Sequence, residues 1–296
     1  MSFVITTCSP ETVVQVSETR HSDIETKRVI SEDLRKTIVV KGSQTHFVLG
    51  WVGLASTPFG HNTTDWLFKA LGEMNARELK IEVIADNLAA LATKRFAELS
   101  TPDKHKHTTF TMAGWQQGVP FFCTVSNYID VYNRISPSFD LRHHIPSVRE
   151  ARDIFPSFER SIQHFENIKD RDYIVHVMGD FKREDLNVRF MGLETLMKRR
   201  APASEIRLAC MEIALEAAEY SKTVGRNLIG VEMDRTGRMM WSFHTEADEA
   251  LIPPYLGPDG AHTQGTLELT VTGGEVTVTN MRAKIAKFEK IEPKAG

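Results

Sequence analysis

Strand-like runs of β-branched residues open the chain. Residues 2–8 and 12–18 are rich in Val, Ile and Thr, and a short segment containing a proline separates them. Residues 35–40 and 45–53 repeat this arrangement around a Gly-Ser pair. Paired runs of β-branched and aromatic residues around a tight turn predict β-hairpins. Two hairpins therefore come first, and the first strand starts almost at the first residue.

The turn of the first hairpin fixes which of its residues lie opposite one another. A two-residue loop at Pro10-Glu11 pairs Ser2 with Thr19 across the two strands. The same register sets Ser2 beside Glu18. The hairpin alone thus predicts that a hydroxyl and a carboxylate meet at one end of the sheet.

The second hairpin makes a similar local prediction. A turn at Gly42-Ser43 sets Lys36 opposite Leu49 and next to Gly50. If the two hairpins stack, an ammonium group and a backbone N–H join the hydroxyl and the carboxylate of the first hairpin.

The rest of the chain alternates between helical and strand-like patterns. The predicted elements are a long amphipathic helix capped at Thr64 and reaching Leu99, a strand pair at 110–115 and 120–125, strands at 161–166 and 173–178, a helix at 186–197, a helix capped at Ser204, a strand pair at 228–233 and 238–243, and a closing hairpin at 266–271 and 275–279. This order favours an α+β fold in which two antiparallel sheets stack face to face with helix layers outside, a four-layer αββα sandwich.

Two segments stand apart from this pattern. Residues 128–158 contain three prolines without a clear period, so we interpret them as an insertion or a long loop. Residues 260–296 form a predicted C-terminal extension that includes the closing hairpin and a charged tail from Lys284. We expect residues 1–296 to form a single domain that carries both additions.

Composition excludes several classes of function. With 296 residues and 41% hydrophobic content, the chain can bury a sizeable core. A net charge of −3 and a pI near 6.4 give no attraction to nucleic acid or to an anionic membrane. The glycine pairs read as turns without a phosphate-binding pattern, so no cofactor is predicted. A protein or small-molecule substrate is the simpler expectation.

Cysteine and histidine usage argues against disulfides and metal sites. The three cysteines, Cys8, Cys123 and Cys210, are far apart and form no CxxC pair. The candidate metal-binding histidines, His105, His107, His143 and His144, have no matching acidic or cysteine cluster, and we interpret them as solvated loop residues. The chain also carries no secretory signal or spanning segment, so we expect it in the cytoplasm.

A family resemblance is carried by three motifs. The first is SFVITTCSPETVVQVSETR at residues 2–20, followed by RKTIVV and LGWVG. Together they resemble the opening of proteasome β-type subunits, which are N-terminal-nucleophile (Ntn) hydrolases. The resemblance aligns Ser2 with the N-terminal nucleophile, Glu18 with the acidic residue and Arg20 with the arginine beside it. It also aligns Lys36 with the catalytic lysine and Gly50 with the glycine whose N–H lines the oxyanion hole.

This resemblance implies a particular chemistry once Met1 is removed. The freed α-amine, with a pKa near about 8, accepts the proton of the Ser2 hydroxyl. Lys36 lowers the hydroxyl pKa by its charge, Glu18 orients the lysine, and Gly50 stabilises the oxyanion. The implied reaction is hydrolysis of a peptide or amide bond through an acyl-enzyme on Ser2. The family also implies a homo-oligomeric ring, and leaves open whether an unfoldase partner exists.

The chain departs from the family pattern at two places. Gly179-Asp180-Phe181 stands where the family has Gly-Ser-Gly, and Ser221 and Val224 replace an aspartate and a serine that support the α-amine. A catalytically inactive, proteasome-like structural or binding subunit therefore remains an alternative. Cys8 as an N-terminal thiol is a weaker one, because Glu18 and Lys36 would lose their register and a buried strand cysteine is the simpler interpretation.

Overall fold

The computed structural model describes residues 3–23, 26–102, 105–129, 153–164, 173–179, 181, 183–245, 249–258, 260–272 and 275–285. Several residues singled out from the sequence lie outside these ranges. They are Ser2, His143, His144 and Asp180, together with the middle of the predicted insertion and the tail beyond residue 285.

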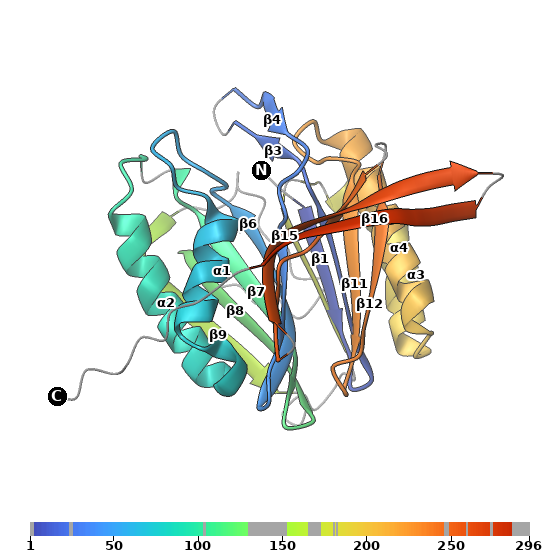
Figure 1. Ribbon diagram of the computed structural model, residues 1–296, viewed down its shortest axis with the longest axis horizontal. Coiled ribbons are helices and arrows are strands. Elements are labelled where there is room, and N and C mark those ends of the chain that lie inside the picture. Colours follow the sequence, from blue (N-terminus) through green and yellow to red (C-terminus); the bar gives the residue numbers. More distant parts are fainter. Residues whose placement is uncertain are drawn as a thin grey trace.

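Four layers in the order helix, sheet, sheet, helix make up the fold (Figure 1). The first sheet has the strand order β10-β1-β2-β11-β12. Its strands are β1 (Phe3–Cys8), β2 (Thr12–Glu18), β10 (Ile174–Gly179), β11 (Leu228–Asp234) and β12 (Met239–His244). β1 and β2, the predicted first hairpin, occupy its centre.

The second sheet has nine strands in the order β13-β15-β14-β5-β6-β7-β8-β9, with β16 paired to β15. Its strands are β5 (Thr37–Lys41), β6 (Thr45–Gly53), β7 (Thr108–Gln116), β8 (Val119–Ile129), β9 (Asp153–His164), β13 (Glu249–Ile252), β14 (Tyr255–Gly257), β15 (Gly260–Thr272) and β16 (Glu275–Ile285). A small separate hairpin joins β3 (His21–Ser22) to β4 (Val29–Ser31).

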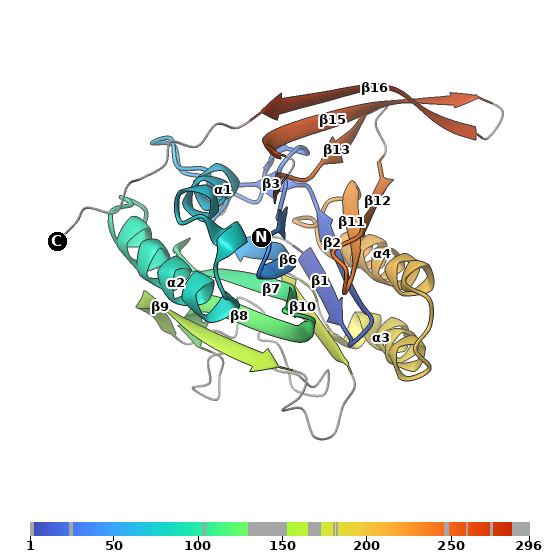
Figure 2. The ribbon, with the colours of Figure 1, turned by 60° about the horizontal axis from the view of Figure 1, so that its bottom comes forward.

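Helices cover the outer face of each sheet (Figure 2). α1 (Thr63–Glu73), the 3-10 helix η1 (Ala76–Glu78) and α2 (Ile81–Ala97) lie over the nine-stranded sheet, and α3 (Arg183–Lys198) and α4 (Ala203–Tyr220) lie over the five-stranded sheet. None of these helices, within the described residues, is long and apolar enough to cross a membrane.

Strand alternation divides the core into layers. In β1, Phe3 and Ile5 belong to the cluster under α3 and α4, whereas Cys8 belongs to the cluster between the two sheets. Successive residues of a strand point to opposite faces, so a strand covered on both sides is apolar at nearly every position. This explains why β1 lacks the alternation of a half-exposed strand. The four-layer αββα arrangement predicted from the sequence is confirmed.

The predicted long helix is in fact two helices. Asn75 adopts a left-handed conformation with φ of 54°, and η1 then separates α1 from α2. A left-handed residue cannot continue a right-handed helix. The cap is also different: Asn62 accepts the backbone N–H of Asp65 at 3.1 Å, while the Thr64 hydroxyl donates to the Arg35 carbonyl at 2.6 Å. Likewise α4 begins at Ala203 without a side-chain cap from the predicted Ser204.

The second hairpin has a different register from the predicted one. Lys41 pairs with His46, so the loop is Ser43-Gln44 and Lys36 falls opposite Trp51. Gly42 is a glycine for another reason, because a Cβ there would lie 1.9 Å from the Arg77 carbonyl oxygen of η1. A close approach of two backbones, rather than the turn, requires this glycine.

Strands extend into both segments that stood apart in the sequence. β8 continues to Ile129 and β9 begins at Asp153, so the ends of the predicted insertion are paired strands. Pro156 belongs to β9, which is the edge strand of its sheet, and an edge is where a proline is tolerated. In the C-terminal extension, β15 and β16 form the predicted closing hairpin with longer strands than the pattern indicated.

Acid should weaken this fold through His176 on β10. Burial lowers the pKa of His176 from 6.5 to about 4, and its ring lies 5.0 Å from that of Phe122. As the pH falls, His176 binds a proton in the unfolded chain before it does so in the folded chain. The free energy of unfolding therefore keeps its full value above pH 6.5 and declines toward pH 4. We expect protonation of this residue to lower the free energy of unfolding by roughly 3 kcal/mol. Urea unfolding of His176→Gln from pH 7 to 4 should show a shallower decline than that of the wild type. Equal slopes for His176→Gln and the wild type would contradict this assignment.

Candidate functional site

A buried ion pair joins the two hairpins. Glu18 ends β2, and Lys36 immediately precedes β5. Both side chains are 0% exposed, and the Lys36 ammonium donates to Glu18 Oε1. Two of the residues predicted to form the site are therefore in direct contact, although they belong to different sheets.

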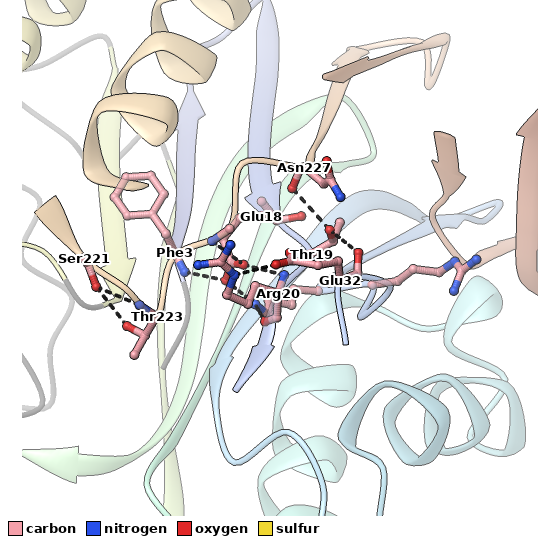
Figure 3. Close-up of polar contacts among 12 residues, drawn as sticks. Phe3, Glu18, Thr19, Arg20, Glu32, Ser221, Thr223 and Asn227 are labelled. Carbon is pink, nitrogen blue, oxygen red and sulfur yellow. Dashed lines mark hydrogen bonds and ion pairs between the residues drawn. The ribbon is translucent and has the colours of Figure 1, made fainter. Parts of the chain in front are cut away.

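Backbone N–H groups hold the Glu18 carboxylate from three directions. Phe3 N donates to Oε1 at 3.1 Å, while Arg20 N and Gly225 N donate to Oε2 at 2.6 and 3.2 Å. Figure 3 shows the backbone of Phe3 and of Arg20 close to Glu18. The acceptors of a buried carboxylate must be satisfied, and here β1, the segment after β2 and the loop before β11 all contribute. The carboxylate is consequently fixed in position before any substrate is present.

The Lys36 ammonium has a second acceptor besides Glu18. It donates to the Arg20 carbonyl at 2.6 Å. Burial lowers the pKa of Lys36 below the ordinary value, while the charge and hydrogen bond of Glu18 oppose that shift. Since desolvation is the larger influence, Lys36 loses its proton more readily than an exposed lysine.

Polar contacts between the sheets fix the relative positions of Glu18 and Lys36. The hydroxyls of Ser17 and Thr37 are 2.9 Å apart, and Thr37 also donates to the side-chain amide oxygen Oε1 of Gln15 at 3.1 Å. All three residues are buried, and Ser17 directly precedes Glu18 while Thr37 directly follows Lys36. Short polar links between β2 and β5 thus replace apolar packing at this end of the sandwich.

The first hairpin has the register that its turn predicted. Val4 pairs with Ser17 and Cys8 with Val13, and Ser9 N donates to the Thr12 carbonyl. Ser2 lies outside the described residues. It is covalently bonded to Phe3, whose nitrogen contacts Glu18.

Gly50 lies in the interior of β6 between β5 and β7. The neighbouring Trp51 N donates to the Lys36 carbonyl at 3.1 Å, so strand alternation turns the Gly50 N–H toward β7. A Cβ at Gly50 would lie 2.8 Å from Val4 Cγ1 and 2.9 Å from Gln15 Cδ. Close packing of the two sheets explains this glycine directly. The oxyanion role remains a prediction that the strand register does not support.

A groove lies beside the ion pair and was not predicted from the sequence. Its volume is about 260 Å³, and it is lined by residues 20–23 on one side and 53–58 on the other. His21 Nε2 and Ser56 Oγ are 3.1 Å apart and link the two walls. Exposed apolar side chains stand near the groove, with Ile30 in its lining and Phe59 next to it. The short strand β3, the end of β6 and the loop residues beside them form the walls, and they carry no periodic pattern from which this groove is predictable.

The loop after α4 contains the departures from the family pattern. The hydroxyls of Ser221 and Thr223 are 2.9 Å apart, a contact that Figure 3 marks with a dashed line. Val224 is buried in the core under α3 and α4, so it has an apolar packing role. Gly225 contributes its N–H to Glu18, a contact that the sequence did not predict.

The other candidate residues are part of the structural framework. Cys8 is a free thiol, 0% exposed, and burial raises its pKa, which disfavours the nucleophilic thiolate. Its interpretation as a buried strand cysteine is confirmed. His107 is buried rather than solvated, because it precedes β7 and its carbonyl accepts the Leu54 N–H. The described residues contain no group of three or more His, Cys, Asp or Glu side chains arranged for a metal ion.

Comparison with known proteins gives a fold but no close relative. No family model matches the chain, and no curated protein matches it. Among solved structures, an Anbu (Gly-1) mutant from Hyphomicrobium sp. strain MC1 aligns with 11% identity and a TM-score of 0.51, covering 84% of this chain and 89% of that one. Anbu (ancestral beta-subunit) from Yersinia bercovieri aligns with 9% identity over 82% and 87% of the two chains, with a TM-score of 0.49. A further Anbu structure from Hyphomicrobium sp. strain MC1 gives 12% identity, 83% and 88% coverage and a TM-score of 0.48.

These findings define a class of fold. The layer order and the first of these alignments identify the fold as that of the proteasome-like N-terminal-nucleophile hydrolases. The particular resemblance is to Anbu, and at 11% identity it concerns the fold alone.

Removing one charge of the Lys36–Glu18 pair should lower the free energy of unfolding more than removing both charges does. Lys36→Met leaves the Glu18 carboxylate buried without its cation, and we expect about 3–5 kcal/mol of destabilisation. Glu18→Gln combined with Lys36→Met should recover part of that loss, because no buried charge remains. Urea denaturation of Lys36→Met, of Glu18→Gln and of the double variant measures the difference, with Lys41→Met at the end of β5 as the control. A double variant as unstable as the sum of the two single variants would contradict the pairing.

Gly50→Ala should destabilise the fold by about 1–3 kcal/mol, because the added methyl group overlaps Val4 and Gln15. The matched control is Gly192→Ala on the exposed face of α3, where a Cβ meets nothing within 4 Å. That control should stabilise the protein by about 1 kcal/mol through helix propensity. Thermal unfolding of both variants provides the comparison, and a stabilised Gly50→Ala variant would exclude the close contact.

Proposed function

We propose that the chain is a proteasome-like N-terminal-nucleophile hydrolase that cleaves peptide or amide bonds through Ser2 after removal of Met1. The observation that carries this proposal is the buried Lys36–Glu18 pair, held against the nitrogen of the residue that follows Ser2. A solvated pair of strand-end charges would not need three backbone N–H groups to fix its carboxylate.

The chemistry requires a group that takes the proton of the Ser2 hydroxyl. Burial lowers the pKa of Lys36 and so favours the neutral amine that accepts this proton, and the free α-amine can do the same. Glu18 then stabilises the ammonium of Lys36 as the hydroxyl attacks the substrate carbonyl. The acyl group passes to Ser2, the amine leaves, and water releases the acid.

The groove beside the ion pair supports a peptide substrate. It begins at Arg20, whose carbonyl accepts from Lys36, and it extends between two backbone segments. Two backbone segments form its walls, and we propose that an extended substrate chain lies between them. Apolar residues near the groove, such as Ile30 and Phe59, would contact side chains further along the substrate.

The same fold similarity supports assembly into a homo-oligomeric ring, which we propose for the active form. A specific observation favours the alternative of an inactive structural or binding subunit. Val224 is buried in the core, so it supplies no polar group at the position where the family supports the α-amine. Retention of Met1, which blocks that amine, would favour this alternative.

Substitution of Ser2 tests the proposed nucleophile. Ser2→Ala removes the hydroxyl and keeps the α-amine, so hydrolysis of fluorogenic peptide amides should fall by about 1000-fold or more. Ser2→Thr retains the hydroxyl and should retain most of the turnover, since the added methyl group only restricts the rotamer. Intact mass spectrometry of each protein establishes whether Met1 has been removed.

Two results would overturn the proposal. One is unchanged turnover in Ser2→Ala. The other is a wild-type protein that has lost Met1, hydrolyses no peptide amide and forms no adduct with a hydroxyl-directed covalent probe.

A further inference from the structure

Glu32, in the segment between β4 and β5, forms an ion pair close to the candidate site. Its Oε1 accepts the Nε–H of Arg20 at 2.7 Å. The guanidinium also donates through its NH1 to the Lys222 carbonyl at 2.9 Å. Figure 3 shows Arg20 and Glu32 beside Glu18. The Arg20 side chain is therefore held at both ends of its guanidinium, by a carboxylate and by the loop after α4.

The backbone of Arg20 contacts both members of the buried pair. Its N–H donates to Glu18 Oε2 at 2.6 Å, and its carbonyl accepts from Lys36 at 2.6 Å. Any shift of this peptide segment would move a hydrogen-bond partner of the carboxylate and of the ammonium together. Fixing the Arg20 side chain thus fixes the geometry of the pair.

Glu32 also packs against the loop that contributes to the site. A Cβ at Gly225 would lie 2.7 Å from Arg20 Cβ and 2.9 Å from Glu32 Oε2. The Glu32 carbonyl in addition accepts the Thr19 hydroxyl at 2.7 Å. Glu32 consequently contacts Thr19 through its backbone carbonyl. Its side chain contacts Arg20 and packs close to the loop at Gly225.

We propose that Glu32 is a positioning residue, which acts through Arg20 to fix the location of the Lys36 ammonium. This role rests on the proposed function for its effect on catalysis. Its effect on Lys36 itself is independent of whether the protein turns over a substrate.

The charges around Lys36 predict effects of opposite sign for the two partners. The negative charges of Glu18 and Glu32 raise the pKa of Lys36, and the positive charge of Arg20 lowers it. His21 also faces Lys36, and burial together with the charge of Lys36 lowers the pKa of His21. Glu32→Gln should therefore lower the pKa of Lys36 further, and Arg20→Met should raise it.

A kinetic experiment measures the catalytic consequence. The rate of Ser2 acylation by a hydroxyl-directed covalent probe is followed from pH 5 to 10. Glu32→Gln should reduce the plateau rate by about tenfold or more, because the pair is no longer held in place. Glu32→Gln should also shift the acid limb of the pH–rate profile of acylation to lower pH, whereas Arg20→Met should shift that limb to higher pH. The control is Glu11→Gln, which neutralises an exposed carboxylate paired with Arg200 and should alter neither quantity.

A second readout separates this inference from the proposed function. Titration of the Lys36 side chain by NMR of lysine-labelled protein, with its signal assigned from its absence in Lys36→Met, reports proton affinity without any turnover. Opposite shifts in Glu32→Gln and Arg20→Met support the positioning role even if no acylation occurs. Unchanged Lys36 titration in both variants, or shifts of the same sign, would overturn it. If the wild-type protein is not acylated, that result contradicts the proposed hydrolase function and leaves the positioning role of Glu32 standing.

Discussion

Burial of opposite charges is the constraint on which this structure depends. Removing a lysine ammonium and a carboxylate from water is costly, and their attraction offsets that cost only when the remaining donors and acceptors are also satisfied. Here the hydrogen-bond partners are three backbone N–H groups and one carbonyl, contributed by β1, the segment after β2 and the loop before β11. The segments that meet at this point are therefore held in one arrangement by the need to keep the pair hydrogen-bonded.

The same constraint connects stability to function. An apolar pair of equal volume would pack this end of the sandwich at least as well, since buried ion pairs seldom add net stability. Burial lowers the pKa of Lys36, and its partner Glu18 also accepts the N–H of the residue that follows Ser2, so the proposed function uses this lysine as a proton acceptor. The groove between residues 20–23 and 53–58 is lined by Arg20, whose backbone contacts both members of the pair, and the proposed function places the substrate there.

Local features of the sequence predicted the parts of the structure that local physics controls. The first hairpin followed from its two-residue loop, and the layer order followed from the alternation of strand and helix patterns. The contact between Glu18 and Lys36 came from the family resemblance, and the structure confirms it. The second hairpin was predicted two residues out of register, because Gly42 is required by the Arg77 carbonyl, which is distant in the sequence. Glu32 and Gly225 were missed for a similar reason, since each is defined by a tertiary contact and neither belongs to a periodic pattern.

The most direct test is a crystal structure of the mature protein in which Ser2 is resolved. The account predicts that Met1 is absent and that the Ser2 hydroxyl lies within hydrogen-bonding distance of the Lys36 ammonium, about 2.6–3.2 Å. A Ser2 side chain directed to the opposite face of β1, or a retained Met1 that occupies the groove, would contradict it.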